Sequence, residues 1–191
     1  MTPPSAKREA KKEKILRRVI IFMTETITEV EAKAILICGK ICSGKTTYAK
    51  KIVKENRAVL LSCDEIMSAL FGWYSENFDE TQEKIIQYIF NKSLDIIKIG
   101  VDVVLDFGFW SKIKRDEAKK FYKDRGINCE IHYIDVDENI WRRNIEKRNR
   151  AVENSETNDV FVDDNLIDKC AGPFEIPDLK EIDVWYKNDW I

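Results

Sequence analysis

Gly39-Lys40-Ile41-Cys42-Ser43-Gly44-Lys45-Thr46 matches the P-loop pattern G-x-x-x-x-G-K-[ST] at every defined position. The run before it, residues 34–38, is short, apolar and rich in β-branched residues, which indicates a buried parallel strand. The residues after it, 48–52, favour a helix. Strand, glycine-containing loop and helix in this order are the structural context that the pattern requires. We therefore expect a loop that binds the phosphates of a nucleotide.

Each residue type in this loop has a physical task. Glycine lets the backbone approach a phosphate chain where a Cβ atom would collide with it. Successive N–H groups and the N-terminus of the following helix then face the anion. Lys45 places its charge against the β- and γ-phosphates, and the Thr46 hydroxyl is a candidate Mg²⁺ ligand. The expected cofactors are thus ATP, or another nucleoside triphosphate, and Mg²⁺. The expected nucleotide-binding residues are Gly39, Lys40, Ile41, Cys42, Ser43, Gly44, Lys45, Thr46 and Thr47.

Composition excludes several classes of protein. With 191 residues, 44% hydrophobic and 35% charged, the chain fits one soluble α/β domain. A net charge of −2 gives no whole-protein attraction to nucleic acid or to an anionic membrane. Five cysteines without a C-x-x-C pair, and a single histidine, argue against a zinc site or a disulfide framework. The apolar run at residues 19–23 is too short to span a bilayer. We expect a cytoplasmic protein, a monomer or a homodimer, without a membrane partner.

The chain divides into an extension and a domain. Residues 1–31 are expected to be a basic N-terminal extension, partly disordered or helical, unless Met23 is the biological start. Residues 32–191 alternate between strand and helix patterns, which predicts an α/β fold with a mostly parallel sheet and helices on both faces. Strands are expected at residues 34–38, 58–62, 101–105, 129–136 and 182–185. Helices are expected at residues 44–55, 64–71, 79–99, 111–125 and 138–150, and the acidic segment between 150 and 182 is expected to be irregular.

Two aspartates stand where strands are expected to end. Asp106 follows the apolar residues 103–105, an arrangement typical of a Walker B carboxylate that holds Mg²⁺; capping of the turn at Phe107 and Gly108 is the alternative. Asp64 follows the second strand. Because the carboxyl ends of parallel strands meet at one crevice, Asp64 is expected near the phosphates, where it could accept the proton of an attacking hydroxyl. The alternative for Asp64 is an N-cap of the next helix.

Four arginines gather on the helix expected after the fourth strand: Arg142, Arg143, Arg148 and Arg150. Trp141 and Ile145, four residues apart, would anchor this helix to the core and leave the arginines facing elsewhere. Guanidinium groups from this segment could close over the phosphates as a lid around residues 137–160. A solvated basic helix face is the alternative.

Four segments together carry a family resemblance: GKICSGKTT, LLSCDEI, VVLDFGFWSKIKRDE and IDVDENIWRRNIEKRN. In this order and spacing, residues 34–149 resemble the AAA_33-type P-loop kinases, which are related to zeta toxins, chloramphenicol phosphotransferase and polynucleotide kinase domains. The resemblance implies an adenylate-kinase-like P-loop fold with a parallel sheet of order 2-3-1-4-5. It also implies that Asp64 activates the acceptor and that Arg143 and Arg148 are lid arginines. An arginine like Arg115 recurs in the relatives, without an assignable role.

We therefore predict a kinase that transfers the γ-phosphate of ATP to a hydroxyl of a small molecule. Its expected catalytic residues are Lys45, Asp64, Arg143 and Arg148, and its expected metal ligands are Thr46 and Asp106. A nucleic-acid 5′-hydroxyl kinase is the first alternative, which the acidic composition and Met67 disfavour, since polynucleotide kinases often carry Arg at the position of Met67. A regulatory ATP-binding module and a zeta-like toxin acting on a sugar nucleotide are the others.

Aromatic residues near the two aspartates have two possible roles. Phe71, Trp73, Tyr74 and Phe78 follow the acceptor-side helix, where they would line a substrate pocket or pack beneath a mobile cap. Phe107, Phe109 and Trp110, beside Asp106, could likewise line a pocket or pack in the core, and here we expect core packing. The sequence alone does not name the acceptor, because side chains from several loops determine pocket specificity.

Overall fold

The computed structural model describes residues 32–73 and 77–189. These residues belong to one compact unit, Ala32–Ile191. The expected N-terminal extension, residues 1–31, lies outside the described residues, as does Tyr74. No helix of the described part is long and apolar enough to cross a membrane.

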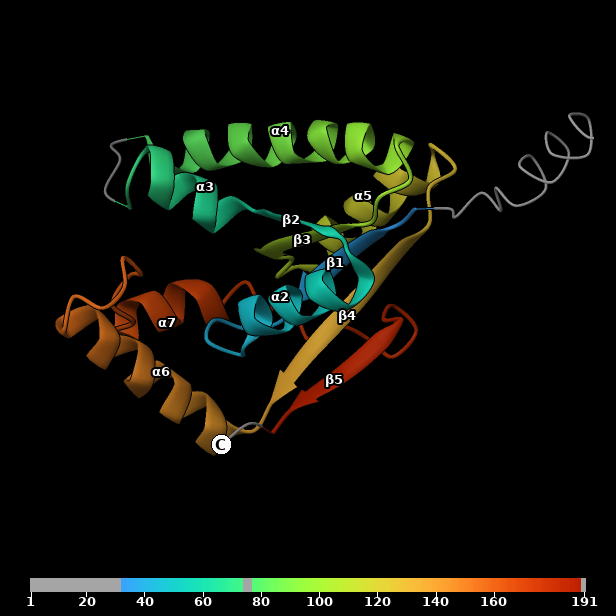
Figure 1. The fold of residues 1–191 in the computed structure, drawn as a ribbon. Coiled ribbons are helices and arrows are strands. Elements are labelled where there is room, and N and C mark those ends of the chain that lie inside the picture. The colour runs from blue at the N-terminus through green and yellow to red at the C-terminus, as the bar shows by residue number, and fades with distance from the viewer. Residues whose placement is uncertain (1–31, 74–76, 190–191) are drawn as a thin grey trace, which may run out of the picture. The chain divides into compact units, whose positions relative to one another are not determined.

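Five strands form a single parallel sheet (Figure 1). They are β1 (Ala34–Cys38), β2 (Val59–Ser62), β3 (Val103–Gly108), β4 (Cys129–Val136) and β5 (Val184–Asn188). Their order is β2-β3-β1-β4-β5, which confirms both the expected fold class and the expected strand order. The carboxyl ends of the three central strands consequently lie side by side, and the loop of residues 39–44 follows the middle one.

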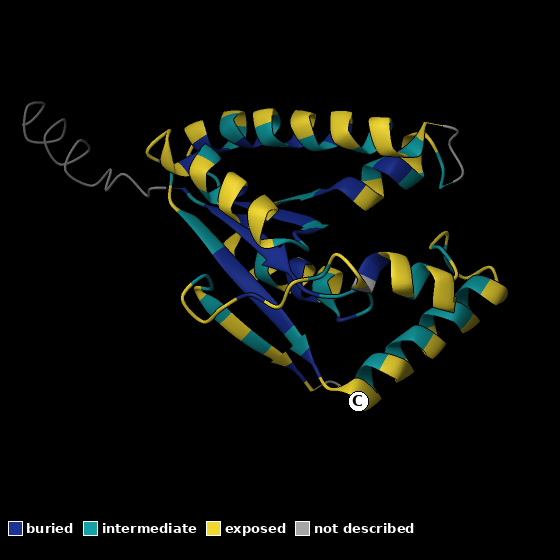
Figure 2. Cartoon of the chain, turned by 180° about the vertical axis from the view of Figure 1, so that it is seen from behind, coloured by how far each residue is buried: buried dark blue, intermediate teal, exposed yellow. Residues whose placement is uncertain are grey.

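Helices cover both faces of the sheet. They are α2 (Lys45–Asn56), α3 (Cys63–Leu70), α4 (Phe78–Lys98), α5 (Lys112–Lys123), α6 (Glu138–Glu153) and α7 (Asp164–Ala171). Alternate residues of β1 point to opposite faces: Ile35 and Ile37 pack with α2, whereas Leu36 packs with α3, α4 and α5. All five residues of β1 are buried, and α6 has no buried residue, as the colours of Figure 2 show. The centre of the sheet is therefore enclosed in the core, whereas α6 lies at the surface.

Three expectations about the elements were wrong. The segment after α6 is not irregular throughout, because it contains α7, which Asp163 caps by accepting a hydrogen bond from the Leu166 N–H at 2.8 Å. The third strand begins two residues later than expected and extends to Gly108, so Asp106 lies within β3 and not at its end. On α4 the helical spacing of Ile86, Phe90, Ser93 and Ile97 predicts one buried stripe; Ser93 and Ile97 are buried, but Ile85 and Ile89 are buried in place of Ile86 and Phe90. The acidic composition of the segment between residues 150 and 182 did not indicate α7. The apolar face of α4 is broad, so the sequence did not determine which of its residues face the core.

Arg115 is a buried arginine that joins two distant segments. Its side chain is 1% exposed. Its Nε donates to Glu181 Oε2 at 3.0 Å, and its Nη1 donates to three backbone carbonyls, those of Phe109, Trp110 and Glu175, at 3.0–3.2 Å. The guanidinium fork thus holds the turn between β3 and α5 against the chain that leads to β5. In this structure the Arg115 guanidinium group stabilises the fold, since its hydrogen bonds go to Glu181 and to backbone carbonyls.

Replacing Arg115 with Ala is expected to lower the free energy of unfolding by about 3–5 kcal/mol, because it removes the buried guanidinium, its ion pair with the partly buried Glu181 and its hydrogen bonds to three carbonyl groups. Lys at this position should recover only part of the loss, since an ammonium group does not reproduce the fork. Lys120→Ala is a matched control on the same helix, where an exposed ion pair with Asp124 is lost; a change of less than about 1 kcal/mol is expected. Urea denaturation measures all three variants. Equal stability of the Arg115→Ala and Lys120→Ala proteins would contradict the structural role.

Candidate active site

The loop between β1 and α2 is folded around close backbone contacts. Gly44 has φ 94° at the N-cap of α2, and a Cβ atom there would collide with the Asn188 amide nitrogen. A Cβ atom on Gly39 would lie 2.7 Å from Ser43 Oγ and 2.9 Å from the Ile134 carbonyl oxygen. No side chain caps the N-terminus of α2, so the amides of its first turn have no side-chain acceptor. The loop can therefore present backbone N–H groups to a phosphate group.

Lys45 and Thr46 begin α2 and point to different partners. The Lys45 ammonium donates to the Lys40 carbonyl oxygen at 2.7 Å. Burial lowers the pKa of Lys45, and the negative charges of Asp106 and Asp64 counter that effect. The Thr46 hydroxyl donates to Asp106 Oδ2 at 2.7 Å, across a sequence separation of 60 residues. Asp106 itself is 4% exposed, held at this depth by its place within β3.

Thr46 and Asp106 are the residues that would hold Mg²⁺ in a nucleotide complex. Mg²⁺ prefers oxygen ligands and usually keeps several waters and substrate phosphate oxygens, so a hydroxyl and a carboxylate suffice from the protein. The described residues contain no group of three or more His, Cys, Asp or Glu side chains that could hold a metal ion. The metal role of this pair stays a proposal.

Asp64 lies in the first turn of α3, across the ends of two strands from the loop. Ser62 and not Asp64 caps this helix, since the Ser62 hydroxyl accepts a hydrogen bond from the Glu65 N–H at 3.3 Å. Ser62 is also the register partner of Asp106, which brings the end of β2 next to β3. Asp64 is an exposed residue, although protein atoms surround its carboxylate group. Burial and the Asp106 charge raise the pKa of Asp64, whereas Lys45 and Arg148 lower it. Because Ser62 caps the helix, the Asp64 carboxylate can interact with a bound ligand.

Helix α6 is attached to the loop and not to the core. The Trp141 indole N–H donates to the Ile41 carbonyl oxygen at 2.6 Å, and the Asn144 side-chain amide donates to the Cys42 carbonyl oxygen at 3.0 Å. The Lys40 ammonium lies 3.9 Å from the centre of a Trp141 ring. The expectation that Trp141 anchors α6 to the core is therefore wrong, because its partner is the phosphate-binding loop.

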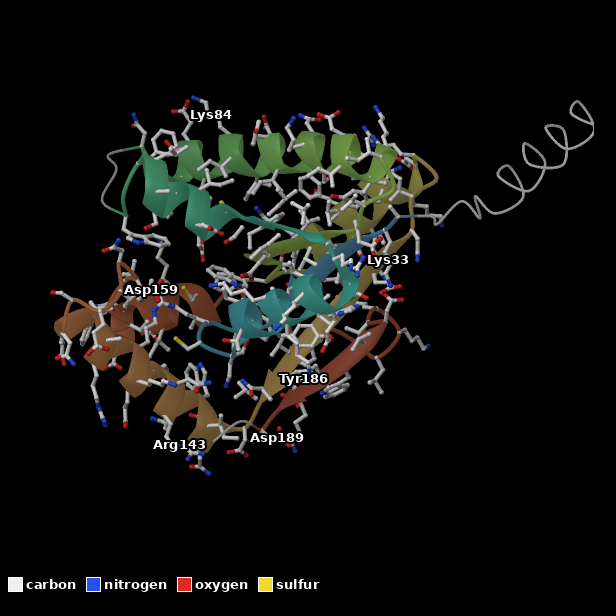
Figure 3. The ribbon with its side chains drawn as sticks, viewed as in Figure 1. Lys33, Lys84, Arg143, Asp159, Tyr186 and Asp189 are labelled. Carbon is white, nitrogen blue, oxygen red and sulfur yellow. The ribbon has the colours of Figure 1, made fainter. Side chains whose placement is uncertain are left out.

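The structure separates the two expected lid arginines. Arg148 faces the loop, with Nη1 at 3.9 Å from Cys42 Sγ, while its Nε donates to the Val160 carbonyl oxygen at 3.1 Å. Arg143 is exposed, and five residues on a helix place it about 140° around the axis from Arg148. Figure 3 shows Arg143 near the start of α6 and Asp159 beyond its far end. Both arginines line the cleft beside the loop, and of the two Arg148 contacts a loop residue, Cys42.

A cleft of about 2210 Å³ joins these groups. Asp64 lines it, and its two flanks are α4 with α5 on one side and α6 with α7 on the other. Of the expected nucleotide-binding residues, the lining contains Ile41, Cys42, Gly44, Lys45, Thr46 and Thr47, but not Gly39, Lys40 or Ser43. Sites for one small molecule usually measure about 300–1,000 Å³, so this cleft has room for two ligands. Of the described aromatic residues that follow Asp64, Trp73 and Phe78 line the cleft. Phe71 is 53% exposed and does not line it.

Several residues at the site were missed in the sequence. Asn144 is one, although its spacing of three residues from Trp141 places both on one side of a helix. Asn188 is another: its amide donates to the Ser43 carbonyl oxygen at 2.8 Å, 145 residues away. No local pattern reveals such a contact. Phe107, Phe109 and Trp110 all line the cleft, and of the three only Phe109 is also buried, as core packing predicts.

Comparison with known proteins gives a family and a fold. The AAA_33 family model, described as an AAA domain, matches residues 35–169. A search of curated protein sequences finds no significant match.

Solved structures with a similar fold are kinases and a nucleic-acid repair complex. The Mycobacterium tuberculosis APS kinase CysC, in complex with AMPPNP and APS, has a TM-score of 0.58 and 18% identity over 84% of this chain and 91% of its own. A gluconokinase from Sinorhizobium meliloti 1021 has a TM-score of 0.56 and 14% identity over 84% and 85%. The Pnkp1/Rnl/Hen1 RNA repair complex has a TM-score of 0.60 and 19% identity over 74% and 43%. At these identities the similarity establishes the fold alone.

Proposed function

The chain belongs to the AAA_33 family, and from this premise we propose that it is a kinase that transfers the γ-phosphate of ATP to a hydroxyl of a small molecule. The observation that carries the proposal is the position of Asp64, which shares one cleft with Lys45 and the Thr46–Asp106 pair. A protein that only binds a nucleotide has no need of a second carboxylate at this place. The kinase folds of the three compared structures support the same reading.

Each residue has a distinct task in the proposed reaction. Lys45 and the loop amides bind the phosphates, and Thr46 and Asp106 would hold Mg²⁺, which neutralises phosphate charge when bound. Asp64 accepts the proton of the acceptor hydroxyl as its oxygen forms a bond to the γ-phosphorus. The bond between that phosphorus and the bridging oxygen breaks, and ADP leaves with the electron pair. Arg148 lies beside the loop, where it can stabilise the charge that develops on the transferred group.

The proposal is tested by ATP turnover with Mg²⁺, measured with purified protein alone and against pools of neutral metabolites, nucleosides, antibiotics, sugar acids and 5′-hydroxyl oligonucleotides. ADP release that depends on an acceptor is the expected result. Transfer to oligonucleotides, with binding that weakens steeply as salt rises, would favour the nucleic-acid kinase. Tight ATP binding without transfer to any pool would favour a regulatory ATP-binding module.

We further propose that residues 137–160 act as a lid over the nucleotide. Helix α6 contacts the loop through polar side chains and contributes no buried residue to the core, so its attachment can change without unfolding the domain. The Trp73 indole N–H also donates to the Asn158 carbonyl oxygen at 2.8 Å, which links the two flanks across the cleft. An arginine on a movable helix can follow the phosphates during closure.

Arg148→Ala is expected to lower acceptor-dependent turnover by about 100-fold, since one preorganised charge contributes roughly 3 kcal/mol to a phosphoryl-transfer transition state. Arg143→Ala is the matched comparison from the same helix. It should have a smaller effect, within about tenfold, because Arg143 is exposed at the cleft whereas Arg148 contacts the loop. Steady-state ADP release with saturating ATP distinguishes the two variants. A larger loss at Arg143 than at Arg148 would contradict this assignment.

A further inference from the structure

One wall of the cleft is apolar and aromatic. Ile86 and Phe90 on α4, Phe107 on β3 and Phe121 on α5 all line the cleft and are only partly buried. Phe90 touches both other rings, with centroids 5.9 Å from Phe107 and 4.9 Å from Phe121. These residues lie on the flank that also carries Asp64, opposite α6 and α7. An acceptor whose hydroxyl reaches Asp64 would therefore contact this wall.

The arrangement of α4 shows that this surface packs against the core on one side and is open to the cleft on the other. Ile85 and Ile89 are 6% and 0% exposed and fill the space against the sheet. Ile86 and Phe90 stand one position further round the helix and line the cleft. The helix thus presents one apolar row to the core and a second to the cleft. Apolar side chains in a concave site contribute binding energy to a ligand with an apolar body.

The charges on the same wall are mostly negative. Asp64, Asp79, Glu80 and Glu117 line this flank of the cleft, and its one lining cation is Lys114. Lys84 pairs with Glu80 along α4, and neither Asp79 nor Glu117 has an ion-pair partner among residues 32–73 and 77–189. The other lining cations, including Lys45 and Arg148, lie on the loop, α6 or α7, where the nucleotide phosphates are expected. Lys45 and Arg148 also act on the Asp64 charge, so an anionic group on the acceptor would meet its uncompensated like charges at Asp79 and Glu117.

We propose that the acceptor is a neutral or cationic alcohol with an aromatic or aliphatic body, and that this wall excludes acceptors with a phosphate, sulfate or carboxylate group near the hydroxyl. The inference rests on the proposed kinase function and names its substrate class. Base stacking on the same rings would also suit a nucleic acid. Its phosphates, however, require several cations on the acceptor wall, and Lys114 is the single one that lines it in the described part of the chain.

Three probes with one phenyl ring and one hydroxyl group test the charge preference: 2-phenylethanol is neutral, phenylalaninol is cationic and 3-phenyllactate is anionic. Their binding to the full chain, with Mg²⁺ and a non-hydrolysable ATP analogue, is measured by tryptophan fluorescence, since Trp73 and Trp110 line the cleft. We expect the first two to bind at least about tenfold more tightly than the third, as one uncompensated like-charge contact implies. Equal or tighter binding of 3-phenyllactate, or binding of none of the probes, would overturn the inference.

Charge variants test whether this wall causes the preference against the anionic probe. Glu117→Lys is expected to reduce the preference against 3-phenyllactate by about tenfold, because it replaces a repulsive with an attractive contact. Glu83→Lys is a control with the same change of net charge on the outer side of α4, and it should leave the preference within about twofold because Glu83 does not line the cleft. Similar shifts in both variants would mean that net charge, and not this wall, determines the preference.

A ring variant tests the apolar part of the inference separately. Phe107→Ala should weaken binding of all three probes at least about fivefold, with Phe121→Leu as the milder change if the first variant does not fold. Nucleotide binding is measured in the same samples. If the wild-type protein does not bind the nucleotide, the proposed kinase function is wrong. If it binds the nucleotide but prefers the anionic probe, only the proposed class of acceptor is wrong.

Discussion

Asp64→Asn is expected to lower acceptor-dependent ADP release by about 10²–10⁴-fold while ATP affinity changes little. The carboxylate is the proposed proton acceptor, and an amide of the same shape cannot accept a proton at neutral pH. Glu65→Gln is the matched control in the same turn of α3, exposed and outside the cleft. It should retain nearly full turnover. Full activity of the Asp64→Asn protein would remove Asp64 from the mechanism.

The pH dependence of this variant provides a second readout. Burial and the Asp106 charge raise the pKa of Asp64. As pH is lowered, acceptor-dependent turnover by the wild-type protein should therefore begin to fall at a higher pH than an ordinary aspartate would give. The Asn variant should lack this acidic limb. The sign for stability is opposite: a carboxyl with a raised folded-state pKa binds its proton more readily in the folded protein, so wild-type stability increases as pH falls through that pKa. The Asn protein should therefore be at least as stable as wild type at pH 7, so a loss of activity there would not reflect unfolding.

Lys45→Ala is expected to abolish measurable phosphotransfer, a loss of at least about 10³-fold, and to weaken ATP binding as well. The reason is electrostatic: Lys45 is the cation that α2 places at the loop, where the low pKa caused by its burial would rise again beside a phosphate. Lys50→Ala on the exposed side of the same helix is the control and should retain wild-type turnover. Isothermal titration with ATP and steady-state ADP release separate binding from chemistry.

Wild-type turnover by the Lys45→Ala protein would show that the loop does not bind the transferred phosphate. A protein that binds ATP normally but turns it over 10³-fold more slowly would keep Lys45 in the mechanism and confine its role to the transition state. Both results leave the fold untouched, because Lys45 makes its hydrogen bond within the loop itself, to Lys40.

Local patterns predicted the parts of the site that depend on neighbouring residues. β1 was predicted with its observed bounds, because an uninterrupted β-branched run before a glycine loop has few other structures. The starts of α2 and α5 were predicted to within one residue, at 44 and 111, and these two positions are the N-caps Gly44 and Ser111. The Ser111 hydroxyl caps α5 by accepting a hydrogen bond from the Lys114 N–H. The chain order of strands and helices was enough to predict a parallel sheet. The order of its strands came from the family resemblance.

Contacts between distant segments were decided by the tertiary structure. The sequence suggested both roles of Asp64, and only the position of Ser62 showed that the helix cap belongs to another residue. The arginine cluster predicted a lid, yet the rotation of α6 determines that Arg148 and not Arg143 meets the loop. Which apolar row of α4 faces the core depends on how the whole helix is turned against the sheet. Residue type and helical period limit such choices, but packing between elements far apart in the chain selects one of them.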